Sequence, residues 1–149
     1  MAYEFKTLRM VEFADTDMAG ILHFSNYFRY MEAAEHAFFR SLGLSVHPSN
    51  PSGPENAYGA ARRSAACTFT QPLRYEDVVE LHVLVKEKSS RSISYVFSFS
   101  KKPELTEVAR GEMTVVFVTK AGDGSSLTAI PIPPEVDALV EAAPPEMLA

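Results

Sequence analysis

The feature that most constrains the fold is one broad apolar helical segment that stands among segments of alternating polarity. Residues 26–42 place apolar side chains at helical spacing, and further apolar residues extend beyond that stripe. Such breadth predicts a helix that is covered on several sides. Ser25 or Asn26 is the expected N-cap, and Gly43 is a natural C-terminal stop.

Outside this helix, apolar residues alternate with polar ones, which is the period of a strand. We expect strands at residues 3–13, 61–71, 77–87, 91–101 and 107–119. Alternation gives each strand one buried face and one wetter face, as in an antiparallel sheet. The chain therefore predicts an α+β fold, in which one curved five-stranded antiparallel sheet wraps around one long central helix.

Length and the placement of Pro and Gly predict a single domain. The chain has 149 residues, which suits one core, and no internal boundary interrupts it. Residues 45–60 are rich in Pro, Gly and Asn and indicate a loop, while residues 122–124 indicate a turn. Residues 135–149 form a short C-terminal extension, and a short helix is expected at 135–143.

Composition excludes several functional classes. The formal net charge of −5 makes the chain a poor candidate for general nucleic-acid binding. No run approaches the ~20 apolar residues of a membrane span, and the charged, alternating N-terminal segment is unlike a secretory signal. A single cysteine, Cys67, can form neither an internal disulfide nor a cysteine-rich zinc site. We therefore expect a cytoplasmic protein.

The densest polar feature is the pair Asp15 and Asp17, followed by Gly20, between the first strand and the helix. Asp and Gly are typical turn formers, so a plain turn is one interpretation. An EF-hand calcium loop does not fit, because the fifth and twelfth positions counted from Asp15 are Ala19 and Asn26. An aspartate phosphotransferase domain would need a longer α/β chain, and the histidines lack metal-ligand spacing. We expect no metal.

A second interpretation of this loop is acyl-transfer chemistry. The helix begins just downstream, and the unpaired N–H groups at a helix N-terminus attract anions. A carboxylate beside such donors can attack a carbonyl or activate water, while the donors hold the developing oxyanion.

The run FADTDMAGILHFSNYFRYMEAA at residues 13–34 resembles a known signature. It is similar to that of hot-dog-fold acyl-CoA thioesterases of the 4-hydroxybenzoyl-CoA thioesterase type, which include the short-chain acyl-CoA thioesterases linked to the Tol-Pal system. The resemblance covers most of residues 3–135. It implies a hot-dog fold and hydrolysis of a small acyl- or aroyl-CoA thioester to free acid and CoA, with no cofactor, since CoA is part of the substrate.

The resemblance also implies catalytic roles. Asp17 matches the catalytic aspartate, as nucleophile or as general base for water. Phe24 would offer its backbone N–H to the oxyanion, and Gly20 would let the backbone approach closely. Many relatives of the Tol-Pal branch have an aromatic residue followed by His here, whereas this chain has His23 followed by Phe24. His23 would orient the thioester or the attacking water, or would be a structural hydrogen-bonding residue.

Further positions match substrate-binding regions of the family. Asn26 and Tyr27 match the pair at the helix start, where Asn26 is better suited to capping than to substrate contact. Glu32 matches an acidic position that can face the acyl pocket, and its alternative is a solvated or interface carboxylate. The region that contacts the nucleotide end of CoA matches a predicted hairpin, which holds Lys88, Ser89, Ser90 and Arg91. Basic side chains there would pair with phosphate oxygens, and Arg62 belongs to a second basic pair.

The resemblance finally implies self-association, because family members bury two active sites between paired subunits whose sheets join. We expect a homodimer or homotetramer. Two alternatives stay open, namely a non-catalytic acyl-CoA-binding protein on the same fold and a hot-dog hydratase or dehydratase. A scaffold has no need of a carboxylate at the helix start, and hydratases usually pair His with an acid in a motif that this chain lacks.

Overall fold

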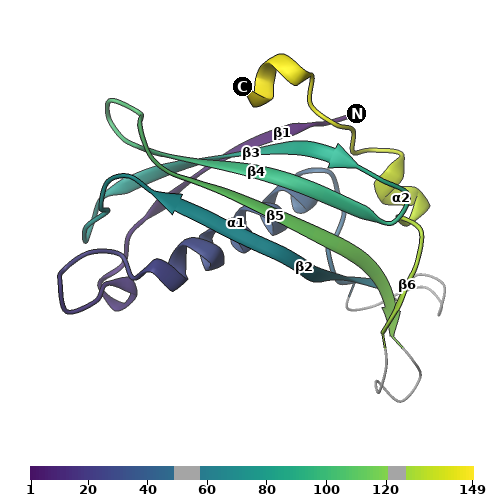
Figure 1. Cartoon of the computed structure of the whole chain (residues 1–149), viewed down its shortest axis with the longest axis horizontal. Coiled ribbons are helices and arrows are strands. Elements are labelled where there is room, and N and C mark those ends of the chain that lie inside the picture. Colours follow the sequence, from purple (N-terminus) through teal and green to yellow (C-terminus); the bar gives the residue numbers. More distant parts are fainter. Residues whose placement is uncertain (49–57, 121–126) are drawn as a thin grey trace.

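The computed structural model describes residues 1–48, 58–120 and 127–149 (Figure 1). An antiparallel sheet has the strand order β1-β3-β4-β5-β2, and a short β6 pairs with β5. The strands are β1 (Glu4–Met10), β2 (Tyr58–Phe69), β3 (Val78–Lys88), β4 (Ser92–Lys101), β5 (Thr106–Lys120) and β6 (Leu127–Ala129). The predicted turn at 122–124 and the middle of the predicted loop 45–60 lie outside the described residues.

One long helix, α1 (Phe24–Ser41), packs against one face of this sheet (Figure 1). The side chains on its inner stripe are buried, including Tyr27, Met31 and Phe38. Met31 reaches β5 at Gly111, where a Cβ atom would lie 2.7 Å from the Met31 sulfur. Gly111 therefore leaves room for the end of the Met31 side chain at this crossing of helix and sheet. The predicted α+β architecture, with one helix on one antiparallel sheet, is confirmed.

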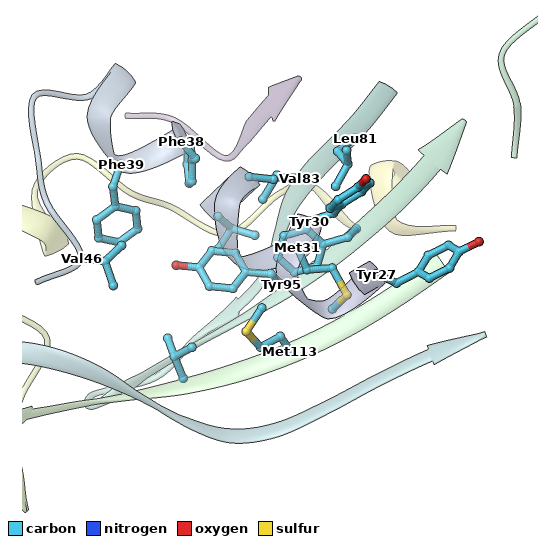
Figure 2. Packing of buried hydrophobic residues seen from close by; sticks show 14 of the residues in the cluster. Tyr27, Tyr30, Met31, Phe38, Phe39, Val46, Leu81, Val83, Tyr95 and Met113 are labelled. Atoms are coloured by element: carbon cyan, nitrogen blue, oxygen red, sulfur yellow. The ribbon is translucent and has the colours of Figure 1, made fainter. Parts of the chain in front are cut away.

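The core lies between α1 and the sheet, as the alternation predicts. On β3 and β4 the residues of one parity are buried against the helix, namely Val79, Leu81, Val83, Val85, Ile93, Tyr95, Phe97 and Phe99. Figure 2 shows Met31 and Met113 among the side chains that fill this space. A smaller cluster covers part of the opposite face, where Met147 and Leu148 pack near Leu84 and Val96.

Several predicted boundaries were wrong. The helix begins at Phe24, and its N-cap is His23 rather than Ser25 or Asn26, because the His23 ring accepts from the Ser25 N–H. The strand predicted at 61–71 runs from Tyr58 to Phe69.

The C-terminal helix predicted at 135–143 is only α2 (Pro134–Asp137). It stops because the Leu139 carbonyl accepts from the Ala2 N–H, and the Asp137 and Val140 carbonyls accept from Lys88 Nζ. These bonds hold the turn after α2 against Ala2 and β3. The three-residue strand β6 was not predicted. No helix in the described part of the chain is both long and apolar enough to cross a membrane.

Candidate active site

Asp17 lies in a tight loop between a 3-10 turn, η1 (Phe13–Asp15), and the start of α1. The Asp17 N–H donates to the Ile21 carbonyl at 2.9 Å, and the Gly20 N–H donates to the Asp17 carbonyl at 3.0 Å. Gly20 has φ of +80°, a conformation that side chains disfavour. The glycine of the predicted motif therefore lets the chain reverse directly after Asp17.

The Asp17 carboxylate is half-buried and has one oxygen to spare. Oδ1 accepts from the Ala19 N–H at 2.8 Å and, at a longer 3.4 Å, from the Ile21 N–H. Among the described residues no group bonds Oδ2. Those two backbone donors orient the carboxylate and leave Oδ2 free to act on another molecule.

The N-terminus of α1 presents one uncommitted backbone donor. His23 Nδ1 accepts from the Ser25 N–H at 3.2 Å and lies 2.8 Å from Ser25 Oγ, while the Asn26 N–H donates to the His23 carbonyl. Within residues 1–48, 58–120 and 127–149, nothing accepts from the Phe24 N–H. Since helix N-terminal N–H groups carry partial positive charge, this donor suits an oxyanion. The His23 ring stacks on Phe24, with centroids 4.7 Å apart.

Asp17 and Phe24 line the same cavity, whose volume is about 470 Å³. Its walls are mainly apolar. The lining residues are Asp17, Ile21, Leu22, Phe24, Tyr27, Phe69, Thr70, Gln71 and Pro72. Tyr27 packs edge-on against Phe69 at 4.7 Å, and 62% of Phe24 remains exposed at the rim. The cavity therefore offers an aromatic wall beside the carboxylate and the free N–H.

Asp15 is a residue of this site that the sequence analysis left without a role. Its Oδ2 accepts from the Tyr30 hydroxyl at 2.8 Å, and its carbonyl accepts from Asn26 Nδ2 at 2.8 Å. Asn26 therefore ties the helix to the loop and does not cap the helix. The only signal for Asp15 in the sequence is its place in the Asp-x-Asp motif.

Glu32 lies outside the cavity of its own chain. Its side chain is 54% exposed, and its Oε2 is 3.1 Å from Arg62 Nη2. The same guanidinium reaches Glu35, a fully buried acid that the sequence analysis missed, at 2.8 Å. Burial raises the pKa of Glu35, and the Arg62 charge partly opposes that rise. Arg62, one of the second basic pair, is therefore engaged by two carboxylates.

The predicted CoA-binding hairpin lies at the far end of the sheet from Asp17 (Figure 1). The Ile21–Arg74 bridge sets the Asp17 loop before the start of β3, whereas the hairpin follows its end. β3 spans 11 residues, which corresponds to roughly 35 Å. A single chain therefore does not bring the hairpin to Asp17.

Within that hairpin, Lys88 is already occupied. Its Nζ lies 2.8 Å from Asp137 Oδ1 and donates to the Val140 carbonyl at 2.7 Å. The Ser89 hydroxyl is 2.6 Å from that of Ser92, and the Ser90 carbonyl accepts from the Ile132 N–H. Arg91 is exposed, and no side-chain partner for it occurs in the described part of the chain. Arg91 is thus the basic group of the hairpin that is free to meet a phosphate.

Neither the single cysteine nor the possible metal ligands of the described residues offer a second reactive site. Burial raises the pKa of the Cys67 thiol to about 11, so the thiol stays protonated at neutral pH and is a poor nucleophile. No group of three or more His, Cys, Asp and Glu side chains that could hold a metal ion occurs among the described residues.

Comparison with known proteins gives consistent matches. The family model described as "Thioesterase-like superfamily" matches residues 11–140. The chain is 30% identical over 137 residues to a 4-hydroxybenzoyl-CoA thioesterase of Pseudomonas sp. (strain CBS-3), covering 89% of this chain and 94% of that protein. It is 39% identical over 92 residues to a putative esterase of Aquifex aeolicus (strain VF5), covering 62% of this chain and 66% of that protein.

Solved structures agree with these matches. The structure of the Pseudomonas 4-hydroxybenzoyl-CoA thioesterase superposes with a TM-score of 0.81 at 28% identity, covering 93% of this chain and 99% of that chain. A D17N variant of a 4-hydroxybenzoyl-CoA thioesterase, complexed with 4-hydroxybenzoyl-CoA, superposes with a TM-score of 0.76 at 27% identity, with coverage of 93% and 99%. The hot-dog fold predicted from residues 13–34 is confirmed.

Proposed function

Because the chain belongs to the thioesterase-like superfamily, we propose that it hydrolyses a small acyl- or aroyl-CoA thioester to the free acid and CoA. The observation that carries this proposal is one cavity lined by both Asp17, which has a spare carboxylate oxygen, and Phe24, whose backbone N–H has no acceptor among the described residues. The relative that was solved with 4-hydroxybenzoyl-CoA bound had an aspartate replaced by asparagine. That complex supports an aspartate in the chemical step here.

Asp17 begins the reaction by one of two routes. As nucleophile, its Oδ2 forms a bond to the thioester carbonyl carbon, the C–S bond breaks, CoA leaves as a thiolate, and water then hydrolyses the acyl-aspartyl anhydride. As general base, Asp17 takes a proton from water while the water oxygen attacks the same carbon, and the C–S bond then breaks so that CoA leaves as a thiolate that takes up this proton. Either route leaves the acid and CoA, and neither uses a metal or other cofactor.

In both routes the carbonyl oxygen gains negative charge, and the Phe24 N–H would stabilise it. Removing one donor of this kind typically costs about 10²–10³ in rate. His23 would serve this step through the helix start, because its ring caps the Ser25 N–H and so leaves Phe24 as the free donor. Tyr27 and Phe69 would flank the acyl group. Because the walls of the cavity are mainly apolar, they favour an uncharged acyl group.

The proposed active unit is a homodimer at least, in the cytoplasm. The pocket reaches Phe69 at the end of β2, and among the strands that the structure describes β2 has one neighbour, β5. A second copy paired along β2 would cover the open rim of the cavity. The phosphates of CoA would then be bound by Arg91 of one of the two copies.

The test is a thiol-release assay over a panel of acyl- and aroyl-CoA esters. The wild type should cleave at least one ester, and Asp17→Asn should lose about 10²–10⁴ of kcat. Glu12→Gln, an exposed acid of the same segment, is the matched control and should keep wild-type activity. Full activity in Asp17→Asn would contradict the mechanism. Binding of CoA esters without cleavage would instead indicate an acyl-CoA-binding protein.

A further inference from the structure

Asp15 connects the catalytic loop to α1 through both its side chain and its backbone. Its Oδ2 accepts from the Tyr30 hydroxyl at 2.8 Å. Its carbonyl oxygen accepts from the His23 N–H at 3.0 Å and from Asn26 Nδ2 at 2.8 Å. One residue of the loop is therefore hydrogen-bonded to three residues at the start of the helix.

The helix side of this connection is rigid. Tyr30 is 1% exposed, and the guanidinium carbon of Arg9 on β1 lies 4.2 Å from its ring centroid. Burial and the Asp15 carboxylate raise the pKa of Tyr30, so its hydroxyl stays protonated and donates to Asp15. The buried ring and its hydroxyl therefore hold the carboxylate of Asp15, the last residue of η1, against α1.

Both proposed reacting groups lie close along the chain to atoms bonded to Asp15. Asp17 follows Asp15 by two residues, and Phe24 follows His23, whose N–H donates to the Asp15 carbonyl. A shift of Asp15 would therefore move the Asp17 carboxylate and the Phe24 N–H relative to one another. We infer that Asp15 is a positioning residue, which sets the separation between Asp17 and the oxyanion donor by holding the loop to Asn26 and Tyr30. This inference rests on the proposed thioesterase activity.

The expected kinetic signature is a loss in kcat with KM preserved, because Asp15 touches the helix and not the cavity. Displacement of catalytic groups by about 1 Å can cost about 10² in rate. We expect Asp15→Ala to lower kcat about 10- to 100-fold and to change KM less than about threefold. Asp15→Asn keeps an oxygen that can accept from Tyr30 and should stay within about threefold of the wild-type kcat.

The experiment combines these variants with Tyr30→Phe, which removes only the donor hydroxyl. If Asp15 acts through Tyr30, Tyr30→Phe alone should also lower kcat, and Asp15→Ala with Tyr30→Phe should lose no more than Asp15→Ala. Thermal unfolding is measured on each variant, since a purely structural role would lower the unfolding temperature and leave the kcat of folded enzyme unchanged. Glu12→Ala is the matched control, because that side chain makes no capping bond.

Three results would overturn the role of Asp15. They are wild-type kcat in folded Asp15→Ala, losses in the double variant that multiply, and a loss in Asp15→Asn as large as that in Asp17→Asn, which would indicate a chemical role. Should Asp15→Ala fail to fold, unchanged kcat in Tyr30→Phe overturns the role by itself. If the wild type cleaves no thioester, the proposed function fails and the role of Asp15 fails with it. If the wild type is active and one of the three results is found, only the role of Asp15 fails, so the two failures are distinguishable.

Discussion

At the scale of single residues, the buried carboxylate of Glu35 needs an opposing charge, which comes from another element and not from α1. Its carboxylate has no exposed surface, and Arg62 supplies the opposing charge from β2. Glu32, Tyr95 and His36 face the same group. A buried charge that loses its partner is strongly destabilising. The pair is therefore a point where one substitution should strongly lower the stability of the protein.

We predict that Arg62→Met lowers the free energy of unfolding at pH 8 by about 3 kcal/mol, near the low end for a buried pair, since Arg62 is 30% exposed. The loss should shrink toward pH 5. Burial already raises the pKa of Glu35, and removal of Arg62 raises it further. The folded state then holds a proton that the unfolded state releases, so stability falls as pH rises above the ordinary carboxyl pKa.

Denaturant unfolding of the variant at pH 5 and pH 8 measures this difference. Arg62→Met combined with Glu35→Gln is the matched control, because a neutral amide leaves no buried charge. The double variant should regain most of the stability at pH 8 and lose the pH dependence. An equal loss at both pH values would contradict an ionised Glu35.

Residues of this kind show which contacts a sequence can predict. Asp17, Gly20 and Tyr27 lie within one short run, and local turn and helix chemistry places them together. Glu35 and Arg62 are 27 positions apart, and nothing near either residue indicates the other. His23 as a cap depends on where the backbone enters α1, which residue type alone does not specify.

At the scale of elements, the β3–β4 hairpin holds two basic residues with different roles, one structural and one free for phosphate binding, which the sequence alone does not distinguish. Lys88 is 20% exposed and binds Asp137 at the end of α2 and the Val140 carbonyl beyond it, whereas Arg91 is exposed. We predict that Arg91→Ala raises KM for a CoA ester roughly fivefold, about 1 kcal/mol of phosphate contact, with little change for the matching pantetheine ester. The thermal unfolding temperature should stay at its wild-type value. Equal KM changes for both esters would remove Arg91 from nucleotide binding.

Lys88→Ala is the companion variant in the same hairpin. It should lower the unfolding temperature, because Asp137 and the Val140 carbonyl lose their partner. Its KM ratio for the two esters should match that of the wild type.

Long elements such as α1 and β3 could be predicted because many residues share one period. The end of α2 could not be predicted from sequence, because it depends on hydrogen bonds from Lys88, which lies 49 to 52 residues away along the chain.

At the scale of the whole molecule, the two edges of the sheet differ. β1 is a short edge of seven residues, and the C-terminal segment pairs beside it through Ala2 and Val140. β2 is 12 residues long, and its residues 63–66 are exposed on both faces. A long strand with a free edge is a template for pairing with another chain. Subunit pairing along β2 would use that edge and close the open rim at Phe69.

We therefore predict a mass by light scattering of at least twice the 16.4 kDa chain. Ala66→Lys places a long charged side chain on the free edge, where Glu112 on β5 is its cross-strand neighbour, so the fold of one chain should tolerate it. This variant should sediment at the single-chain mass and lose kcat/KM by about tenfold or more, because the cavity rim stays open. Leu8→Lys, on the exposed face of β1, is the matched control and should keep both mass and activity. A fully active single chain would show that the pocket is complete without a partner, and the pairing along β2 would then have no part in catalysis.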